Sequence, residues 1–338
     1  MRAVVGALAV AALALSSACK HEGAAQAPGP GAAATKRTAA PTRKPQSSPA
    51  EPPKPSYRIS AHESAAAALR AVLAAHPDVR VLGFGEYHQK KGAAKVTSAI
   101  KRFTSALLPL VNARASDLIV ETWVSTGACG KTEQRVAKVV RKTTKRPVTT
   151  ENEVVTLIKR ADKLHVRPHI LKMTCKDYEH VRPKGKVDFA RFLKLTGDQL
   201  LAKIVAVRKD RDALRAKLAN AKGNKAARMR AILARKQLVL VYGGALHNDR
   251  APSKEFAAYA YGPRASKAAG EGRYVEVDLF VPEYIEEKGS LVSEEGWFAE
   301  FRRRASAQQA LLIRRGPGSY AIVFRRSAKK VAPKTGKP

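Results

Sequence analysis

Four side chains that lie far apart in the sequence have types that catalyse hydrolysis or bind metals. Glu86 and His88 follow one apolar run, Glu121 ends another, and His247 follows a third after the turn at 243–246. Two imidazoles and two carboxylates can hold a divalent ion such as zinc, manganese or iron, with open positions for water or substrate. The same groups can work without metal, as an acid/base pair in which a carboxylate orients a histidine. The sequence leaves both chemistries open.

The elements that would position these side chains alternate along the chain. Apolar runs predict strands at 79–84, 117–121, 166–171, 237–242, 274–281 and 320–325. Capping boxes and helical periodicity predict helices at 60–75, 94–113, 150–164 and 187–235, the last broken near Gly223. This order indicates an α/β fold, a three-layer sandwich with a mainly parallel sheet, room for a mixed edge, and helices on both faces.

The predicted sheet explains why four scattered residues would meet. In an open parallel sheet the carboxyl ends of the strands share one edge, and ligands bind in the crevice there. Glu86, His88, Glu121 and His247 all follow or end strands, so we expect them to converge at this edge. They are therefore the candidate catalytic residues and the candidate ligands of a divalent metal.

The N-terminus is typical of an exported protein. Arg2 precedes an apolar run at 3–15, and the small residues 16–18 precede Cys19, which is the organisation of a secretory signal. A cysteine at this point resembles a bacterial lipobox, although Ser16 stands where Leu is usual. We expect a signal at 1–19 and a lipid on Cys19, which would anchor the protein to the cell envelope on the periplasmic or outer-membrane face. A secreted protein with an unmodified Cys19 is the alternative.

Composition divides the rest of the chain into three parts. Residues 20–56 hold eight of the 19 prolines among Ala, Gly, Ser and Thr, which predicts a disordered linker. Residues 57–326 contain all the predicted elements and are expected to form a single α/β domain. The basic segment 327–338, with two prolines and a glycine, predicts a disordered tail.

The chain is strongly basic, with 63 Lys and Arg against 28 Asp and Glu and a formal charge of +35. Part of this charge lies on the predicted helices of 184–236. Their basic face is either simply solvated or attracted to anionic lipid or acidic polysaccharide. We expect no nucleic-acid partner. An exported protein leaves the compartment in which nucleic acid is the usual partner of a basic protein, and no nucleic-acid motif accompanies the charge.

Cysteine and histidine usage narrows the chemistry further. Three cysteines without a Cys-x-x-Cys pair argue against a zinc finger or a redox dithiol. Cys129 and Cys175 each follow a strand, and an exported protein allows a disulfide between them. The other histidines near the third strand, at 165, 169 and 180, are expected to be structural or exposed to solvent.

Two short motifs resemble a known superfamily. The run RVLGFGEYH at 80–88, with GALH at 244–247, resembles erythromycin esterases, ChaN-like haem-binding lipoproteins and Tiki/TraB-type proteins. These proteins share a Gly-Glu-x-His-like motif after the first strand, an acid at the end of a later strand, and a late Gly-x-x-His. The four candidate residues match these places in order. Erythromycin esterases space the Glu and His one residue further apart, so the spacing here is closer to the ChaN-like and Tiki-like members.

The resemblance implies two activities. A Tiki-like relationship implies metal-dependent peptide hydrolysis. A ChaN-like relationship implies binding of haem or iron, for which Tyr87, Tyr242 and His247 are candidate axial donors. Our first hypothesis from the sequence is a metal-dependent hydrolase of the envelope. A haem- or iron-binding lipoprotein without catalysis is the second, and a non-catalytic binding protein of the envelope surface is the third.

Overall fold

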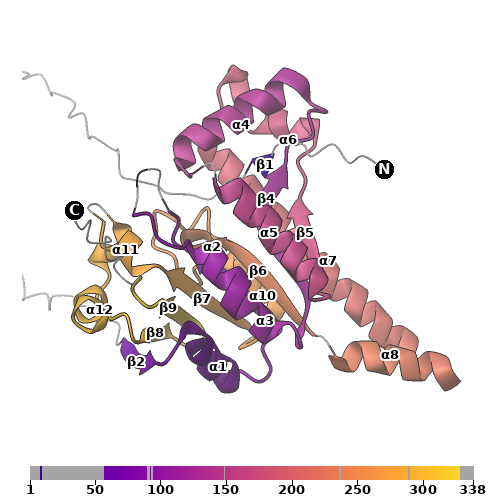
Figure 1. The fold of residues 1–338 in the computed structure, drawn as a ribbon. Coiled ribbons are helices and arrows are strands. Elements are labelled where there is room, and N and C mark those ends of the chain that lie inside the picture. The colour runs from indigo at the N-terminus through magenta and orange to yellow at the C-terminus, as the bar shows by residue number, and fades with distance from the viewer. Residues whose placement is uncertain are drawn as a thin grey trace, which may run out of the picture.

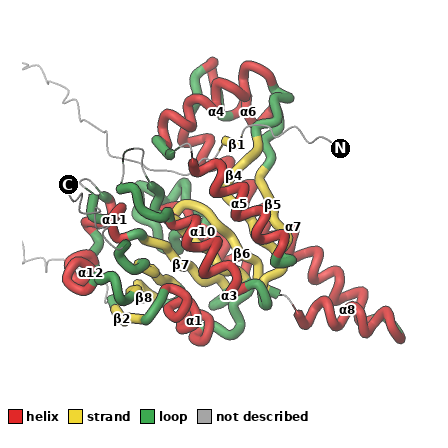
Figure 2. Tube along the Cα trace, viewed as in Figure 1, coloured by secondary structure: helices red, strands yellow, loops and turns green. Residues whose placement is uncertain are grey.

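The structure is a computed structural model that describes residues 8–9, 57–89, 92, 94–147, 149–235, 237–287 and 290–327. Cys19, the linker at 20–56 and the tail beyond 327 lie outside these residues. The described residues form one mixed sheet with helices on both faces, as Figures 1 and 2 show. The predicted three-layer α/β architecture is confirmed.

The sheet of the described residues has nine strands. Their bounds are β1 (Leu8–Ala9), β2 (Arg58–His62), β3 (Val81–Glu86), β4 (Ala115–Val124), β5 (Arg167–Leu171), β6 (Leu238–Gly244), β7 (Tyr274–Phe280), β8 (Ala310–Gly316) and β9 (Ser319–Val323). They follow the order β1-β4-β6-β3-β7-β9-β8-β2, and β5 pairs with β4. The pairs from β5 through β4, β6, β3 and β7 to β9 are parallel, whereas β1, β2 and β8 pair antiparallel. The mixed edge is therefore formed by β8 and β2.

Helices connect the parallel strands. The longer ones are α1 (Ala65–Ala75), α4 (Gly130–Thr144), α5 (Thr149–Lys163), α7 (Phe189–Ala219), α8 (Gly223–Arg235) and α10 (Gly262–Ala269). The shorter ones are α2 (Ala99–Arg102), α3 (Leu108–Val111), α6 (Cys175–His180), α9 (Ala245–Asn248), α11 (Pro282–Ile285) and α12 (Phe298–Arg304). A π-helical turn, Phe103–Leu107, joins α2 to α3. The distal part of α7 and all of α8 project away from the sheet (Figure 1).

Apolar side chains cover both faces of the sheet. One core joins Leu82, Phe84 and Leu240 to the helices α1 to α3 and α5. The other joins Val81 and Val239 to α4, α6, α7 and α10. Successive strand residues point to opposite faces, so the alternating residues of β3 and β6 divide between the two cores. Strands buried on both sides read as continuous apolar runs, which is why the sequence identified them.

Two predicted boundaries are wrong, for local reasons. The proposed capping box at Ser60 and Glu63 does not start a helix, because residues 58–62 form β2 against β8. Helix α1 starts after Ser64 instead, whose hydroxyl accepts a hydrogen bond from the Ala67 N–H at 3.1 Å. Strand β4 continues to Val124, so Glu121 lies inside the strand and not at its end.

Candidate active site

The four predicted residues lie at the carboxyl edge of the parallel strands. Glu86 is the last residue of β3 and His88 lies two residues beyond it, while Glu121 lies in β4 and His247 in α9, directly after β6. Their exposed fractions are only 3% to 5%. Burial of four ionisable side chains at one edge requires that they be paired.

Glu86 and His88 form the first pair. The His88 Nδ1 atom lies 3.0 Å from the Glu86 Oε1 atom, and the Tyr242 hydroxyl donates a hydrogen bond to Glu86 Oε2. Tyr242 reaches Glu86 from β6, which lies beside β3 in the sheet. Both oxygens of this carboxylate are thus engaged, and its orientation is fixed from two directions.

Arg146 adds a positive charge to this pair. It lies between α4 and α5, its side chain is 8% exposed, and its Nη2 atom contacts His88 Nδ1 and lies 3.8 Å from Glu86 Oε1. Burial raises the pKa of Glu86, but the interactions with His88, Arg146 and Tyr242 outweigh this effect and lower it overall. Burial, followed by the charge of Arg146, lowers the pKa of His88 to about 4. Near neutral pH the site therefore holds a carboxylate, a neutral imidazole and a guanidinium.

The protonation state leaves one nitrogen of His88 available. Nδ1 lies against both the Glu86 carboxylate and the Arg146 guanidinium, and we assign its proton to the bond with Glu86 because an ionised carboxylate only accepts. The lone pair then lies on Nε2. Among the described residues this buried atom has no hydrogen-bond partner, and the same holds for the Nε atom of Arg146. The site thus contains an unused acceptor, His88 Nε2, and an unused donor, Arg146 Nε.

Glu121 and His247 form the second pair. The His247 Nδ1 atom is hydrogen bonded to Glu121 Oε1, and the backbone N–H of Gly244 donates to Glu121 Oε2 at 2.9 Å. A side chain at 244 would be crowded, because a Cβ there would lie 3.2 Å from His88 Nε2. The free nitrogen of the first pair therefore faces the backbone that holds the second pair.

The sheet brings the two pairs together from opposite faces. Tyr242, which holds Glu86, belongs to the core under α1 to α3 and α5. Ile119 and Trp123, which flank Glu121 at two-residue spacing in β4, belong to the core on the opposite face. The site thus draws its side chains from both faces of the sheet at this edge. Glu86 and His247, which it brings together, lie 161 positions apart in the sequence.

A second buried polar cluster fixes the short helix that carries His247. The Asn248 amide donates to the Gly83 carbonyl at 3.0 Å and to Asp278 at 3.3 Å. Arg315 in turn contacts Asp278 at 2.7 Å and also pairs with Glu276. Burial raises the pKa of both acids, so the single guanidinium is shared by two carboxyl groups that resist ionisation. This cluster anchors α9 to β3 and β7 beside the candidate site.

The remaining predicted residues have simpler roles. Tyr87 packs against Phe280, with ring centroids 6.1 Å apart. His169 is hydrogen bonded to the buried Asp117 at 2.8 Å, which confirms a structural role, and His180 is exposed at the end of α6. Cys129 and Cys175 form the predicted disulfide, which joins the starts of α4 and α6. Cys19 lies outside the described residues.

The four residues do not fit a metal ion as they are arranged. Both oxygens of Glu86 and of Glu121 already accept hydrogen bonds, and the Arg146 guanidinium lies against the first pair. In the part of the chain that the structure describes, no three His, Cys, Asp or Glu side chains are grouped as metal ligands. The divalent metal expected from the sequence stays a prediction, and we derive no chemical step through it.

Sequence reasoning missed Arg146. The chain has 63 Lys and Arg, and this one stands in a Lys-Arg-Pro loop after a basic helix. Nothing in its local sequence separates it from solvated arginines. The only available signal is physical: two buried carboxylates at one edge need a nearby cation, and a loop that enters that edge can supply it.

Fold and site together define an α/β protein with two carboxylate–imidazole pairs at the carboxyl edge of its sheet. No model of a protein family matches the chain, and no curated protein matches it. Among solved structures it is similar to the type III effector HopBA1, with a TM-score of 0.38 and 12% identity over 82% of this chain and 100% of that one. It is also similar to a Bacillus cereus protein, with a TM-score of 0.36 and 12% identity over 76% of this chain and 91% of that one.

Proposed function

We propose that this protein is a hydrolase of the bacterial cell envelope that cleaves an ester or amide bond at the Glu86–His88 and Glu121–His247 pairs. The observation that carries the proposal is the Nε2 atom of His88, a buried basic nitrogen without a partner among the described residues. A carboxylate holds the opposite side of the same ring. This is the arrangement that a general base requires.

His88 would activate water. A water molecule on Nε2 donates its proton to the imidazole as its oxygen attacks the carbonyl carbon of the substrate. The negative charge that develops on the carbonyl oxygen is stabilised by the Arg146 guanidinium, whose Nε–H is an unused buried donor. Buried charges act strongly here because little water screens them.

His247 would complete the reaction. Glu121 orients the ring of His247 through Nδ1, and in the imidazolium form the opposite nitrogen carries a proton that it supplies to the leaving oxygen or nitrogen as the bond to carbon breaks. His88 then releases its proton to solvent, His247 takes up a proton from solvent, and the acid product leaves. All four side chains are nearly buried, so the covering side chains at this edge must move apart for substrate to enter.

Three variants of the full-length protein test this function. The probes are 4-nitrophenyl esters and peptide 4-nitroanilides, which report ester and amide cleavage. We expect His88→Gln and Glu121→Gln to lower kcat by about 10²- to 10⁴-fold, the usual contribution of a general base. The matched control, His180→Gln, changes an exposed histidine and keeps the rate of the unchanged protein. Folding of each variant is checked by circular dichroism.

Two outcomes would overturn the proposal. One is a folded His88→Gln variant that hydrolyses the probes as fast as the His180→Gln control. The other is an unchanged protein that cleaves neither probe faster than buffer, which would favour a non-catalytic binding protein of the envelope surface.

The haem-binding alternative uses the same edge. One of its candidate axial donors is already engaged, because Tyr242 donates to Glu86, whereas His247 is bonded to Glu121 through Nδ1 and not through Nε2. It stays a prediction, and an absorption spectrum of the purified protein tests it. A Soret band that is lost in a His247→Ala variant would replace the hydrolase with a haem-binding protein.

The envelope location rests on the signal at 1–19 and on Cys19. Among the described helices, none has both the length and the apolar character that a membrane span requires. We propose that a lipid on Cys19 provides the membrane attachment, and mass spectrometry of the N-terminal peptide from the native host tests for it.

A further inference from the structure

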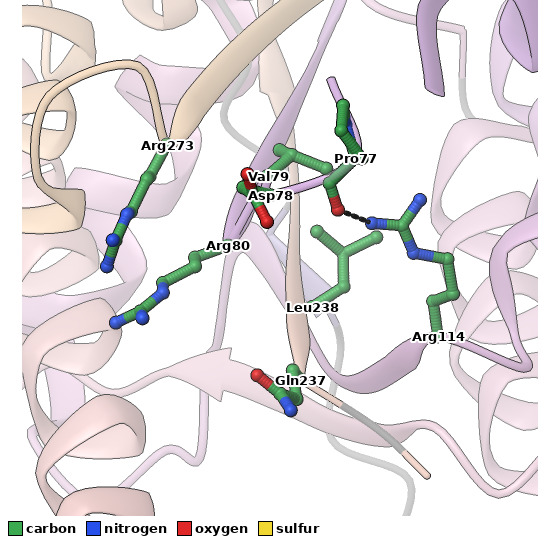
Figure 3. Close-up of a pocket in the computed structure, with 8 residues that line it drawn as sticks. All are labelled: Pro77, Asp78, Val79, Arg80, Arg114, Gln237, Leu238 and Arg273. Carbon is green, nitrogen blue, oxygen red and sulfur yellow. Dashed lines mark hydrogen bonds between the residues drawn. The ribbon is translucent and has the colours of Figure 1, made fainter. Parts of the chain in front are cut away.

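A basic pocket lies at the amino edge of the sheet, opposite the candidate active site. It has a volume of about 330 Å³ and lies where β3, β6 and β7 begin. Three arginines line it, Arg80, Arg114 and Arg273, against a single exposed acid, Asp78. Figure 3 shows the side chains of Arg80 and Arg273 extending to the same side of the pocket.

The backbone fixes Arg80 and Arg273 beside each other. The N–H groups of Arg80 and Val81 both donate to the Arg273 carbonyl, at 2.9 and 3.0 Å. These bonds start the pairing of β3 with β7, so the two arginines cannot separate without loss of strand register. Two like charges are therefore held together by the fold.

These two arginines lack the partners that the neighbouring arginines have. Arg114 donates to the Pro77 carbonyl at 2.7 Å, and Arg215 of α7 pairs with Asp212 at 2.8 Å. Within the described residues, no carboxylate lies within 4.0 Å of the Arg80 or Arg273 side-chain nitrogens. Both are free to bind an external anion.

Further positive charge surrounds this pair. Burial, and then the charges of Arg273, Arg215 and Arg208, lower the pKa of Arg80, whereas the charge of Asp212 opposes them. Arg208 and Arg215 belong to α7, which thus brings its basic face toward the amino edge. A single carboxylate would balance only one of these charges, whereas a phosphate group carries up to two and offers several oxygens to the guanidinium forks.

We propose that this pocket binds a phosphate group between Arg80 and Arg273, either on a small soluble molecule or in the headgroup of an anionic lipid. The site lies at the opposite edge from His88, so its ligand is not the substrate of the proposed hydrolase. The inference does not depend on that activity. For a protein tethered at an envelope, such a site would either orient the domain on an anionic surface or respond to a soluble phosphate.

Calorimetric titration of the full-length protein with inorganic pyrophosphate tests the site. The buffer contains about 0.15 M salt, where surface charges more than about 8 Å apart are largely screened. If the ligand is a soluble phosphate, we expect one bound pyrophosphate, and an affinity at least about tenfold weaker in Arg80→Gln/Arg273→Gln, since the loss of even one charge-assisted hydrogen bond weakens binding by about that factor. The matched control is Arg135→Gln/Lys138→Gln, which removes two exposed charges from α4.

Vesicle binding distinguishes the two sources of phosphate. Phosphatidylcholine vesicles with and without phosphatidylglycerol are used with the same three proteins. A lipid ligand predicts tighter binding to the anionic vesicles than to those of phosphatidylcholine alone, a difference that is lost in Arg80→Gln/Arg273→Gln and retained in the control, with little affinity for pyrophosphate. A soluble ligand predicts that the protein binds pyrophosphate and has little affinity for the anionic vesicles. The proposal fails if no probe binds, or if both double variants weaken binding equally, because net charge alone would then explain the attraction.

Discussion

His88 illustrates how burial sets the protonation state on which a catalytic role depends. Its imidazole is enclosed between a carboxylate and a guanidinium, and burial dominates in lowering its pKa to about 4. A histidine in solution would be partly protonated at pH 6.5, where this one stays neutral. The side chain can therefore accept a proton from water over the whole physiological pH range.

The same shift makes stability depend on pH. Below pH 6.5 the unfolded chain binds a proton at His88 that the native protein excludes until about pH 4. Acidification across this window thus lowers the free energy of unfolding, by about 3 kcal/mol from this residue. Urea unfolding at pH 7 and pH 4.5 measures the loss, and we expect a smaller loss in His88→Gln. An equal loss in both proteins would show that His88 is not buried in its neutral form.

Gly244 provides a second test at the scale of one residue. A Cβ at this position would lie 3.2 Å from His88 Nε2 and would crowd the place where water is activated. We expect Gly244→Ala to lower kcat by about tenfold or more, since displacements of about 1 Å cost up to 10²-fold. The control, Gly316→Ala, adds a methyl group with no neighbour within 4 Å. Equal rates in the two variants would place the reaction elsewhere.

At the scale of elements, the disulfide ties two helices together. It joins α4 and α6 across a sequence separation of 46 residues. Closing a loop of that length contributes about 4 kcal/mol in the chain-entropy model. We expect Cys129→Ala/Cys175→Ala to unfold at a clearly lower urea concentration than the oxidised protein. Unfolding at the same concentration would mean that the bridge adds no net stability.

The sequence predicts the buried parallel strands better than it predicts the edge strand β2. The parallel strands β3, β4, β6 and β7 are rich in apolar residues, because both faces of the sheet are covered, and the sequence identifies them all. Strand β2 was mistaken for the start of a helix, since Ser60 and Glu63 match a capping pattern that pairing with β8 overrides. Long-range pairing of this kind leaves little local signal.

At the scale of the whole molecule, the two edges of the sheet carry different groups. The carboxyl edge carries the buried carboxylate–imidazole pairs, and the amino edge carries Arg80 and Arg273, which have no carboxylate partner among the described residues. The first was predictable, because residues that follow parallel strands share one edge. The second was not, because Arg80 and Arg273 become neighbours only through the register of β3 and β7. Because the sequence has many arginines, nothing in it marks these two as neighbours.

The central proposal is that His88 acts as a general base in hydrolysis, and the metal expected from the sequence is the alternative that it must be tested against. The most direct test is to measure metal content and the rate of 4-nitrophenyl ester hydrolysis on one full-length preparation, before and after chelation. The account predicts a rate that survives removal of metal and is lost in His88→Gln. A stoichiometric metal whose removal abolishes the rate, and whose return restores it, would contradict the account.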